Sequence, residues 1–243
     1  MSHYTIQMII KTLASSCLRW QARLLLCVAV YAVQAPLYSQ EAAIWPDTFL
    51  NRVQLVALIQ TLNADLLASR SATFTLERWC RDHGLAEIPK ISAQLVKGTA
   101  KEATVEQRRR LQVSDQDTIK YRRVDLRCGN RVLSEADNWY VPSRLSTEIN
   151  RLLDSTDTPF GKAIESLEPY RQTIAVKQFW TPLPEGWERE NVKLPATTNG
   201  TLVFPDALFE HRAIVYRRDH KPISEVTERY QRQLLAFPPR TSR

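Results

Sequence analysis

The stretch YRRVDLRCGNRVLSEADNWYVP, from Tyr121 to Pro142, decides the fold that we predict for this chain. Its centre is the pair Gly129-Asn130, and both residue types tolerate the positive φ angles that a tight turn requires. The sequences on either side are predicted to be strands, which the turn brings together as an antiparallel hairpin. The proline at the end of the stretch breaks the second strand.

Two helices and a strand are predicted before this hairpin. The segment DTFLNRVQLVALIQTLNADLLAS has apolar residues at the spacing of an amphipathic helix of about four to six turns. SATFTLERWCRDHG predicts a shorter helix, with Ser71 or Thr73 as its N-cap and Gly84 as its stop. ISAQLVKG alternates loosely and indicates a strand. The polar stretch from Thr99 to Gln107 is predicted to be a hairpin connection or an exposed loop.

After the hairpin, the pattern changes to helix and then back to strands. SRLSTEINRLLDS predicts a helix that Ser146 or Thr147 caps, and TIAVKQFW predicts a strand. Between them, TDTPFG predicts a turn, followed by a short helical or extended piece. Prolines and glycines in residues 181–205 indicate a long irregular loop. A last hairpin is predicted to turn near Asp219-His220.

The order of the predicted elements indicates an α+β fold, because helices come first in the sequence and the strands after them are joined by hairpins. We expect a single domain over residues 45–237, with an antiparallel β-sheet flanked by helices, and a tail over residues 238–243. A chain of 243 residues with 44% hydrophobic residues can bury a full core, and its 24% of charged residues is ordinary for a soluble protein.

The first 39 residues differ in composition from the rest of the chain. They contain Lys11, Arg19 and Arg23 but no acid, and the apolar run LLLCVAVYAV follows. Ten apolar residues are about half of what a bilayer-spanning helix needs, so we predict a signal peptide that is cleaved between residues 32 and 40. A retained membrane anchor and a mis-assigned start codon are the alternatives. The expected location is periplasmic or secreted in a bacterium, with no membrane attachment after cleavage.

Removal of this leader leaves 30 basic and 26 acidic residues, a net charge of +4, which is weak evidence for a polyanionic partner. The run Arg108-Arg109-Arg110 follows Glu106 and is predicted to be a solvated loop, so we expect no nucleic-acid partner. The four histidines have no zinc-ligand spacing with one another or with a cysteine, so we expect no metal. Of the four cysteines only Cys80 and Cys128 remain, and these could pair in an oxidising periplasm.

The second strand of the hairpin contains two acids, and alternation assigns its side chains to two faces. One face receives Glu135, Asp137 and Trp139, and the other receives Ala136, Asn138 and Tyr140. Two carboxylates on one face repel each other unless cations meet them. An ion-pair ladder with arginines such as Arg122 or Arg127 would compensate them, and so would a binding site that includes Trp139. Both interpretations stay open.

Four segments, taken in order, resemble the chorismate pyruvate-lyase family, whose fold is shared by the ligand-binding domains of some bacterial transcription regulators. They are SATFTLERWCRDHG with ISAQLV, YRRVDLRCGNRVLSEADNWYVP, TDTPFG and HRAIVYRRDHKPISEVTERY. TDTPFG is similar to the family's Thr-Pro-Leu-Gly flap turn, and the last segment is similar to its final hairpin with a Lys-Pro turn. No single segment is specific, but the ordered set spans most of the mature chain.

The resemblance also implies site residues. The substrate-binding arginine of the family falls on Arg123, and the catalytic glutamate falls on Glu228, although the spacing leaves Glu225 open. Phe160 and Gly161 take the positions of the flap's leucine and glycine. Alternatively, Arg123 only pairs with an acid across the sheet, either Glu228 or Asp125.

The implied activity is cofactor-independent cleavage of chorismate to 4-hydroxybenzoate and pyruvate. Arg123 would bind a carboxylate of the ligand, and Glu228 would supply a proton. Chorismate is made in the cytosol, however, so an exported enzyme would rarely meet it. We therefore expect a pocket for a small aromatic or carboxylate ligand, with lyase activity as one outcome. A non-catalytic exported ligand-binding or interaction module is the alternative.

Overall fold

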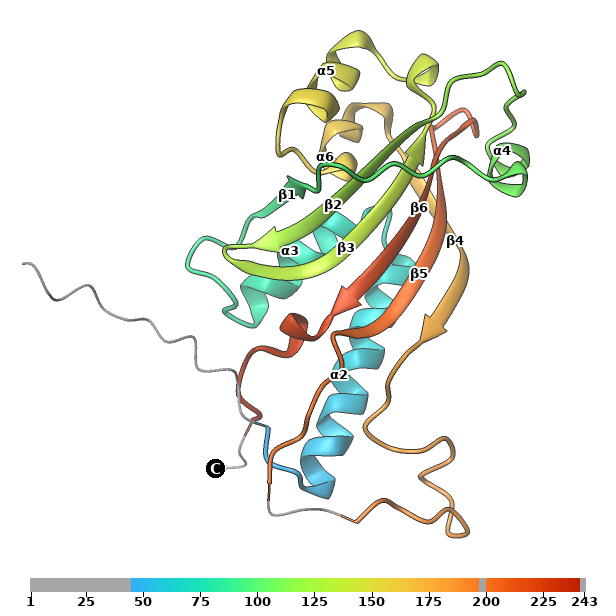
Figure 1. The fold of residues 1–243 in the computed structure, drawn as a ribbon. Helices are drawn as coiled ribbons and strands as arrows, with labels where there is room; N and C mark the ends of the chain where they lie inside the picture. Colours follow the sequence, from blue (N-terminus) through green and yellow to red (C-terminus); the bar gives the residue numbers. More distant parts are fainter. Residues whose placement is uncertain (1–44, 197–199, 241–243) are drawn as a thin grey trace, which may run out of the picture. The chain divides into compact units, whose positions relative to one another are not determined.

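The computed structural model describes residues 45–196 and 200–240 (Figure 1). The predicted signal peptide with its cleavage site, the first two cysteines and residues 241–243 of the predicted tail lie outside the described residues. Within the two described ranges, no helix combines the length and the apolar composition that a membrane span requires.

Six antiparallel strands form one sheet, in the order β1-β2-β3-β6-β5-β4. The strands are Ile91–Leu95 (β1), Lys120–Cys128 (β2), Arg131–Tyr140 (β3), Tyr170–Gln178 (β4), Ala207–Tyr216 (β5) and Pro222–Gln231 (β6). Both predicted hairpins, β2–β3 and β5–β6, are confirmed, and they meet where β3 pairs with β6 (Figure 1). Gly129, in the β2–β3 turn, has a φ angle of 57°, which a residue without a Cβ atom adopts without strain.

Five α-helices lie within the described residues. They are Phe49–Ala68 (α2), Ala72–Asp82 (α3), Val105–Arg110 (α4), Thr147–Ser155 (α5) and Phe160–Ala163 (α6), with three short 3₁₀ helices at Pro142–Arg144, Glu165–Leu167 and Arg232–Leu235. Ser146 caps α5 by accepting a hydrogen bond from the backbone N–H of Ile149, as predicted. Ser71 occupies the N-cap position of α3 but its side chain forms no capping bond.

The basic run 108–110 was expected to be a solvated loop, and this prediction was wrong. The residues form the end of α4, which begins with a capping box between Thr104 and Gln107. Because two reciprocal hydrogen bonds satisfy its first backbone N–H groups, this six-residue helix forms without a clear apolar periodicity. Its last arginine, Arg110, binds the buried carboxylate of Glu225.

Two clusters of buried side chains form the core. The larger cluster lies between one face of the sheet and the helices α2 and α3, and includes Leu55, Leu76 and Phe209. The smaller cluster packs α5 and α6 against the sheet around Tyr140 and Ile223.

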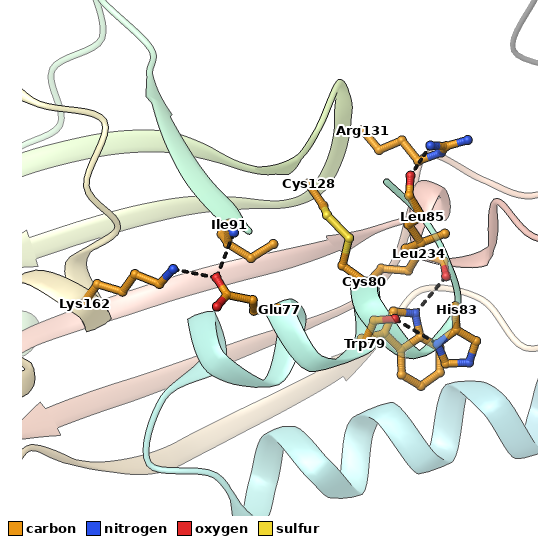
Figure 2. The surroundings of a disulfide bond; sticks show 10 residues. All are labelled: Glu77, Trp79, Cys80, His83, Leu85, Ile91, Cys128, Arg131, Lys162 and Leu234. Carbon is orange, nitrogen blue, oxygen red and sulfur yellow. Dashed lines mark hydrogen bonds and ion pairs between the residues drawn. A yellow bond between two sulfur atoms is a disulfide. The ribbon is translucent and has the colours of Figure 1, made fainter. Parts of the chain in front are cut away.

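The disulfide that the sequence left open is present between Cys80 of α3 and Cys128 of β2, with a Cα–Cα distance of 6.5 Å (Figure 2). Both cysteines are fully buried within the larger core cluster. The bond therefore fixes α3 to the sheet from inside the core.

Candidate functional site

A partly open cavity of about 60 Å³ lies where the two core clusters meet. Its floor is one face of the sheet, formed by β2, β3, β5 and β6. Its walls are the junction between α2 and α3, the helix α6 and the start of β4. This volume is less than half of the roughly 150 Å³ of an engineered cavity that binds benzene.

Strand alternation and register bring the floor residues together. In β2, Arg122, Val124 and Leu126 are spaced two apart and all face the cavity. Arg122 pairs with Asn138 of β3, which pairs in turn with Val226 of β6. These residues form a row across the floor that carries one cationic group, one amide and one apolar group.

Arg122 is a buried cation, with 5% of its surface exposed. Its Nη2 donates to the backbone carbonyl oxygens of Thr158 at 3.2 Å and Thr156 at 3.4 Å. No carboxylate of the described residues forms an ion pair with it. Burial lowers the pKa of Arg122, and the more distant Tyr140 and Asp154 oppose this effect only in part. A buried guanidinium without a counter-ion is costly, so this position favours an anion.

A buried ion pair lies on another side of the cavity. Arg171 of β4 donates through Nη2 to Oε2 of Glu228 at 2.7 Å, and the two side chains are 3% and 7% exposed. Tyr230 also donates to Oε2 of Glu228, at 3.0 Å. Burial lowers the pKa of Arg171, but the adjacent Glu228 outweighs this effect and leaves the pKa raised. The pair is therefore mutually neutralised.

His211 of β5 is the register partner of Glu228 and is fully buried. Its Nε2 lies 2.8 Å from Oδ1 of Asn63, and its Nδ1 has no partner among the described residues. Burial, with a smaller contribution from Arg171, lowers the pKa of His211 to about 4. The imidazole is therefore neutral at neutral pH.

Unpartnered polar atoms are concentrated around the cavity. Seven buried side-chain nitrogen or oxygen atoms have no hydrogen-bond partner within the described part of the chain, and four of them belong to residues that line the cavity. They are Ser71 Oγ, Arg122 Nε, Asn138 Oδ1 and Arg171 Nε. Buried polar groups without partners are rare in folded proteins, so each needs an explanation. A bound molecule with polar atoms would supply partners here.

Three of the six predicted site residues line this cavity. Glu228, Phe160 and Gly161 do so, while Arg123 and Glu225 lie on the opposite face of the sheet with Trp139. The ligand roles of the first three residues stay predictions.

The assignment of Arg123 to the cavity is corrected to Arg122. In β2, Arg122 shares the buried face with Val124, Leu126 and Cys128, and Arg123 points the other way. The family resemblance located the arginine only to within one residue. Because side chains alternate along a strand, a shift of one residue moves the side chain to the opposite face of the sheet.

Arg123 instead forms the ion-pair ladder that was the alternative interpretation. It donates to Glu135 at 2.9 Å and to Asp137 at 3.5 Å, and Lys101 donates to Asp137 at 2.7 Å. The cations of the ladder are therefore Arg123 and Lys101 rather than Arg122 or Arg127. The predicted pairing of Arg123 with Glu228 or Asp125 is wrong as well.

Glu225 and Trp139 anchor the segment that contains α4. Arg110 donates to both carboxylate oxygens of Glu225, at 2.7 and 2.8 Å, and Glu225 is fully buried. The indole N–H of Trp139 donates to the carbonyl oxygen of Lys101 at 3.1 Å. The two side chains thus have structural partners away from the cavity.

Sequence reasoning missed Arg122, Asn138, Arg171 and Ser71 as cavity residues. Alternation along β2 and β3 already assigned Asn138 to the face opposite the acids, which was a usable signal for it. Arg171 had no such signal, because its contact with Glu228 depends on the order of β4, β5 and β6 in the sheet. No group of three metal-ligating side chains occurs in the described ranges.

Comparison with known proteins gives one close sequence relative. No family model matches the chain. The uncharacterized protein y4mC of Sinorhizobium fredii is 47% identical over 195 residues, which cover 80% of this chain and 82% of that protein.

Solved structures with a partly similar backbone are regulator domains. The effector domain of PhnF from Mycobacterium smegmatis has a TM-score of 0.42 at 12% identity, covering 71% of this chain and 95% of that one. A GntR-family transcriptional regulator from Enterococcus faecalis has a TM-score of 0.38 at 14% identity, covering 63% of this chain and all of that one.

Proposed function

This chain belongs to the family of the uncharacterized protein y4mC of Sinorhizobium fredii, and we propose that it binds a small organic carboxylate in the cavity beside Arg122. The observation that carries the proposal is the buried guanidinium of Arg122, which has no counter-ion among the described residues. An arginine can bind a carboxylate with two parallel hydrogen bonds, so a carboxylate ligand would neutralise it.

The charges around the cavity support an anionic ligand. Arg171 and Glu228 neutralise each other, so Arg122 and the more exposed Arg70 leave a positive excess in the lining. A cationic ligand would be repelled, and a neutral ligand would leave Arg122 uncompensated. The apolar floor residues Val124 and Val226 would contact the carbon skeleton of the ligand.

The cavity volume favours a small aliphatic acid over an aromatic one. Acids such as acetate, pyruvate and lactate are smaller than benzene, and the cavity is less than half the size of the roughly 150 Å³ cavity that binds benzene. Benzoate and 4-hydroxybenzoate are larger and would need the walls to move. Chorismate, with its ring, two carboxylates and an enolpyruvyl group, is larger still.

Catalysis is not part of the proposal. Glu228 accepts hydrogen bonds from both Arg171 and Tyr230, and these contacts hold it in a buried ion pair. Export remains part of it: the buried Cys80–Cys128 disulfide supports an oxidising compartment, in agreement with the predicted signal peptide.

A thermal-shift and calorimetry series with pyruvate, L-lactate, acetate, benzoate and 4-hydroxybenzoate tests the proposal. A ligand at 100 times its Kd should stabilise the protein by about 2.7 kcal/mol. The matched variants are Arg122→Met, which should abolish the response, and Arg123→Met, which should preserve it because Arg123 lies on the other face. A flat response across the panel, or an equal response in Arg122→Met, contradicts the proposal.

A further inference from the structure

The helix α3 forms a wall of the cavity with one end and carries the disulfide near its other end. Ser71, at the N-cap, and Thr73, in the first turn, line the cavity. Thr73, Leu76 and Cys80 are buried and have the spacing of one helix face, which packs toward the sheet. Thr73 and Cys80 are seven residues apart, or roughly 10 Å along the helix axis.

The strand β2 has the same arrangement. Arg122, Val124 and Leu126 line the cavity, and Cys128 is the next buried residue on the same face. The disulfide therefore joins α3 to β2 at the cysteine end of their interface. At the other end, the cavity lies between the two elements.

The cavity end of α3 has few other links to the sheet. The Ser71 side chain has no hydrogen-bond partner among the described residues. The backbone N–H and carbonyl of Ser71 bind only the nearby side chains of Ser69 and Thr75. Farther along α3, Glu77 accepts a hydrogen bond from the backbone N–H of Ile91, the first residue of β1, at 2.9 Å (Figure 2). The helix is thus tied to the sheet in its middle and at its disulfide end.

The second wall, α6, depends on the same helix. Lys162 of α6 forms an ion pair with Glu77 of α3 (Figure 2). Gly161 packs so closely on the N-terminus of α3 that an added Cβ atom would lie 2.5 Å from Ser71 Oγ and 3.1 Å from Thr73 Oγ1. A shift of α3 would therefore move both walls of the cavity.

We propose that the Cys80–Cys128 disulfide is a positioning element of the ligand cavity, in addition to its contribution to stability. This inference rests on the proposed carboxylate binding and concerns the same site. An α-helix is stiff over three turns, so fixing Cys80 against β2 also fixes the distance between Thr73 and Arg122. Without the bond, α3 would occupy the binding position for only part of the time. If that fraction is about one tenth, the apparent Kd rises about tenfold.

The test compares wild type with Cys80→Ala/Cys128→Ala. The first measurement is hydrogen–deuterium exchange without ligand, over residues 71–76 and 160–164, and the second is the Kd for pyruvate by calorimetry. Leu55→Ala is the matched control, because it destabilises the core near the far end of α2 and retains the disulfide. If the double variant does not fold, wild type with and without prior reduction by dithiothreitol replaces it.

Faster exchange in both segments, with a Kd about tenfold higher than in Leu55→Ala, supports the inference. Unchanged exchange, or a Kd equal to that of the control, overturns it while leaving carboxylate binding intact. If wild type itself does not bind pyruvate, the exchange measurement decides alone. Faster exchange at the two walls then supports positioning by the disulfide, and exchange equal to that of Leu55→Ala overturns it.

Discussion

Arg122 and Arg123 are neighbours in one strand, yet their surroundings differ in every respect that matters for function. Arg123 lies on the outer face of the sheet, where its side chain is 25% exposed and binds the carboxylates of Glu135 and Asp137. Arg122 lies on the cavity face, is 5% exposed and, within the described part of the chain, donates only to backbone carbonyl oxygens.

The difference shows that a buried charged residue indicates a binding site when it lacks an oppositely charged partner. On the outer face, Lys101, Arg123 and Arg229 each form an ion pair with a carboxylate. On the cavity face, the guanidinium of Arg122 forms no ion pair with a described residue, and the more distant Tyr140 and Asp154 oppose its desolvation only in part. An anionic ligand would therefore gain binding free energy at Arg122 rather than at Arg123. Arg123 already binds carboxylates of the protein, whereas Arg122 binds none among the described residues.

The largest expected effect comes from breaking the ion pair on the cavity face. Glu228→Gln leaves Arg171 as a buried cation without its carboxylate, and should destabilise the protein by about 3–5 kcal/mol. Glu135→Gln, which breaks an ion pair on the outer face, should cost no more than about 1 kcal/mol. Urea denaturation of both variants measures the contrast. Equal losses would show that the two faces do not differ in their electrostatic environment.

A pH effect of about 3 kcal/mol is expected from His211, because its pKa is lowered from 6.5 to about 4. The unfolded chain binds a proton near pH 6.5, whereas the folded protein binds it only near pH 4. Stability from this group is therefore full above pH 6.5 and is lost as the pH falls toward 4.

His211→Gln should remove this slope in denaturation curves recorded between pH 4 and 7. His220→Asn, at an exposed turn position with positive φ, should keep it. A slope that survives His211→Gln would assign the pH dependence to other groups.

The smallest effect on stability is expected for the two neighbouring arginines themselves. Arg122→Met loses two hydrogen bonds to carbonyl oxygens but removes a buried charge, so its stability should stay within about 1 kcal/mol of wild type. Arg123→Met should also lose no more than about 1 kcal/mol. Thermal unfolding measures both values. A loss of several kcal/mol in Arg122→Met would show that Arg122 has a structural role instead.

Local patterns in the sequence were sufficient for most of the fold. The Gly129-Asn130 turn predicted the central hairpin, and the spacing of apolar residues predicted α2, α3 and α5. The helix α4 escaped prediction because a capping box, rather than periodicity, forms it. Its contact with Glu225 joins residues that are 115 positions apart, which no local pattern encodes.

The candidate site was predicted only in part, for a similar reason. Glu228, Phe160 and Gly161 came from the order of motifs, and the structure brings them to one cavity. The choice between Arg122 and Arg123 needed the face of the strand to be known. The partner of Glu228 is Arg171, which reaches it across the intervening strand β5.

The sequence by itself determined which segments become strands and helices, and that the acids of β3 share one face, because these properties depend on neighbouring residues. Only the tertiary structure decided which face is buried, which charges meet a counter-ion and where space remains. Those features arise from strand order and helix packing, which bring distant residues together. An unpaired charge is defined by every group around it, so it becomes visible only when the whole chain is folded.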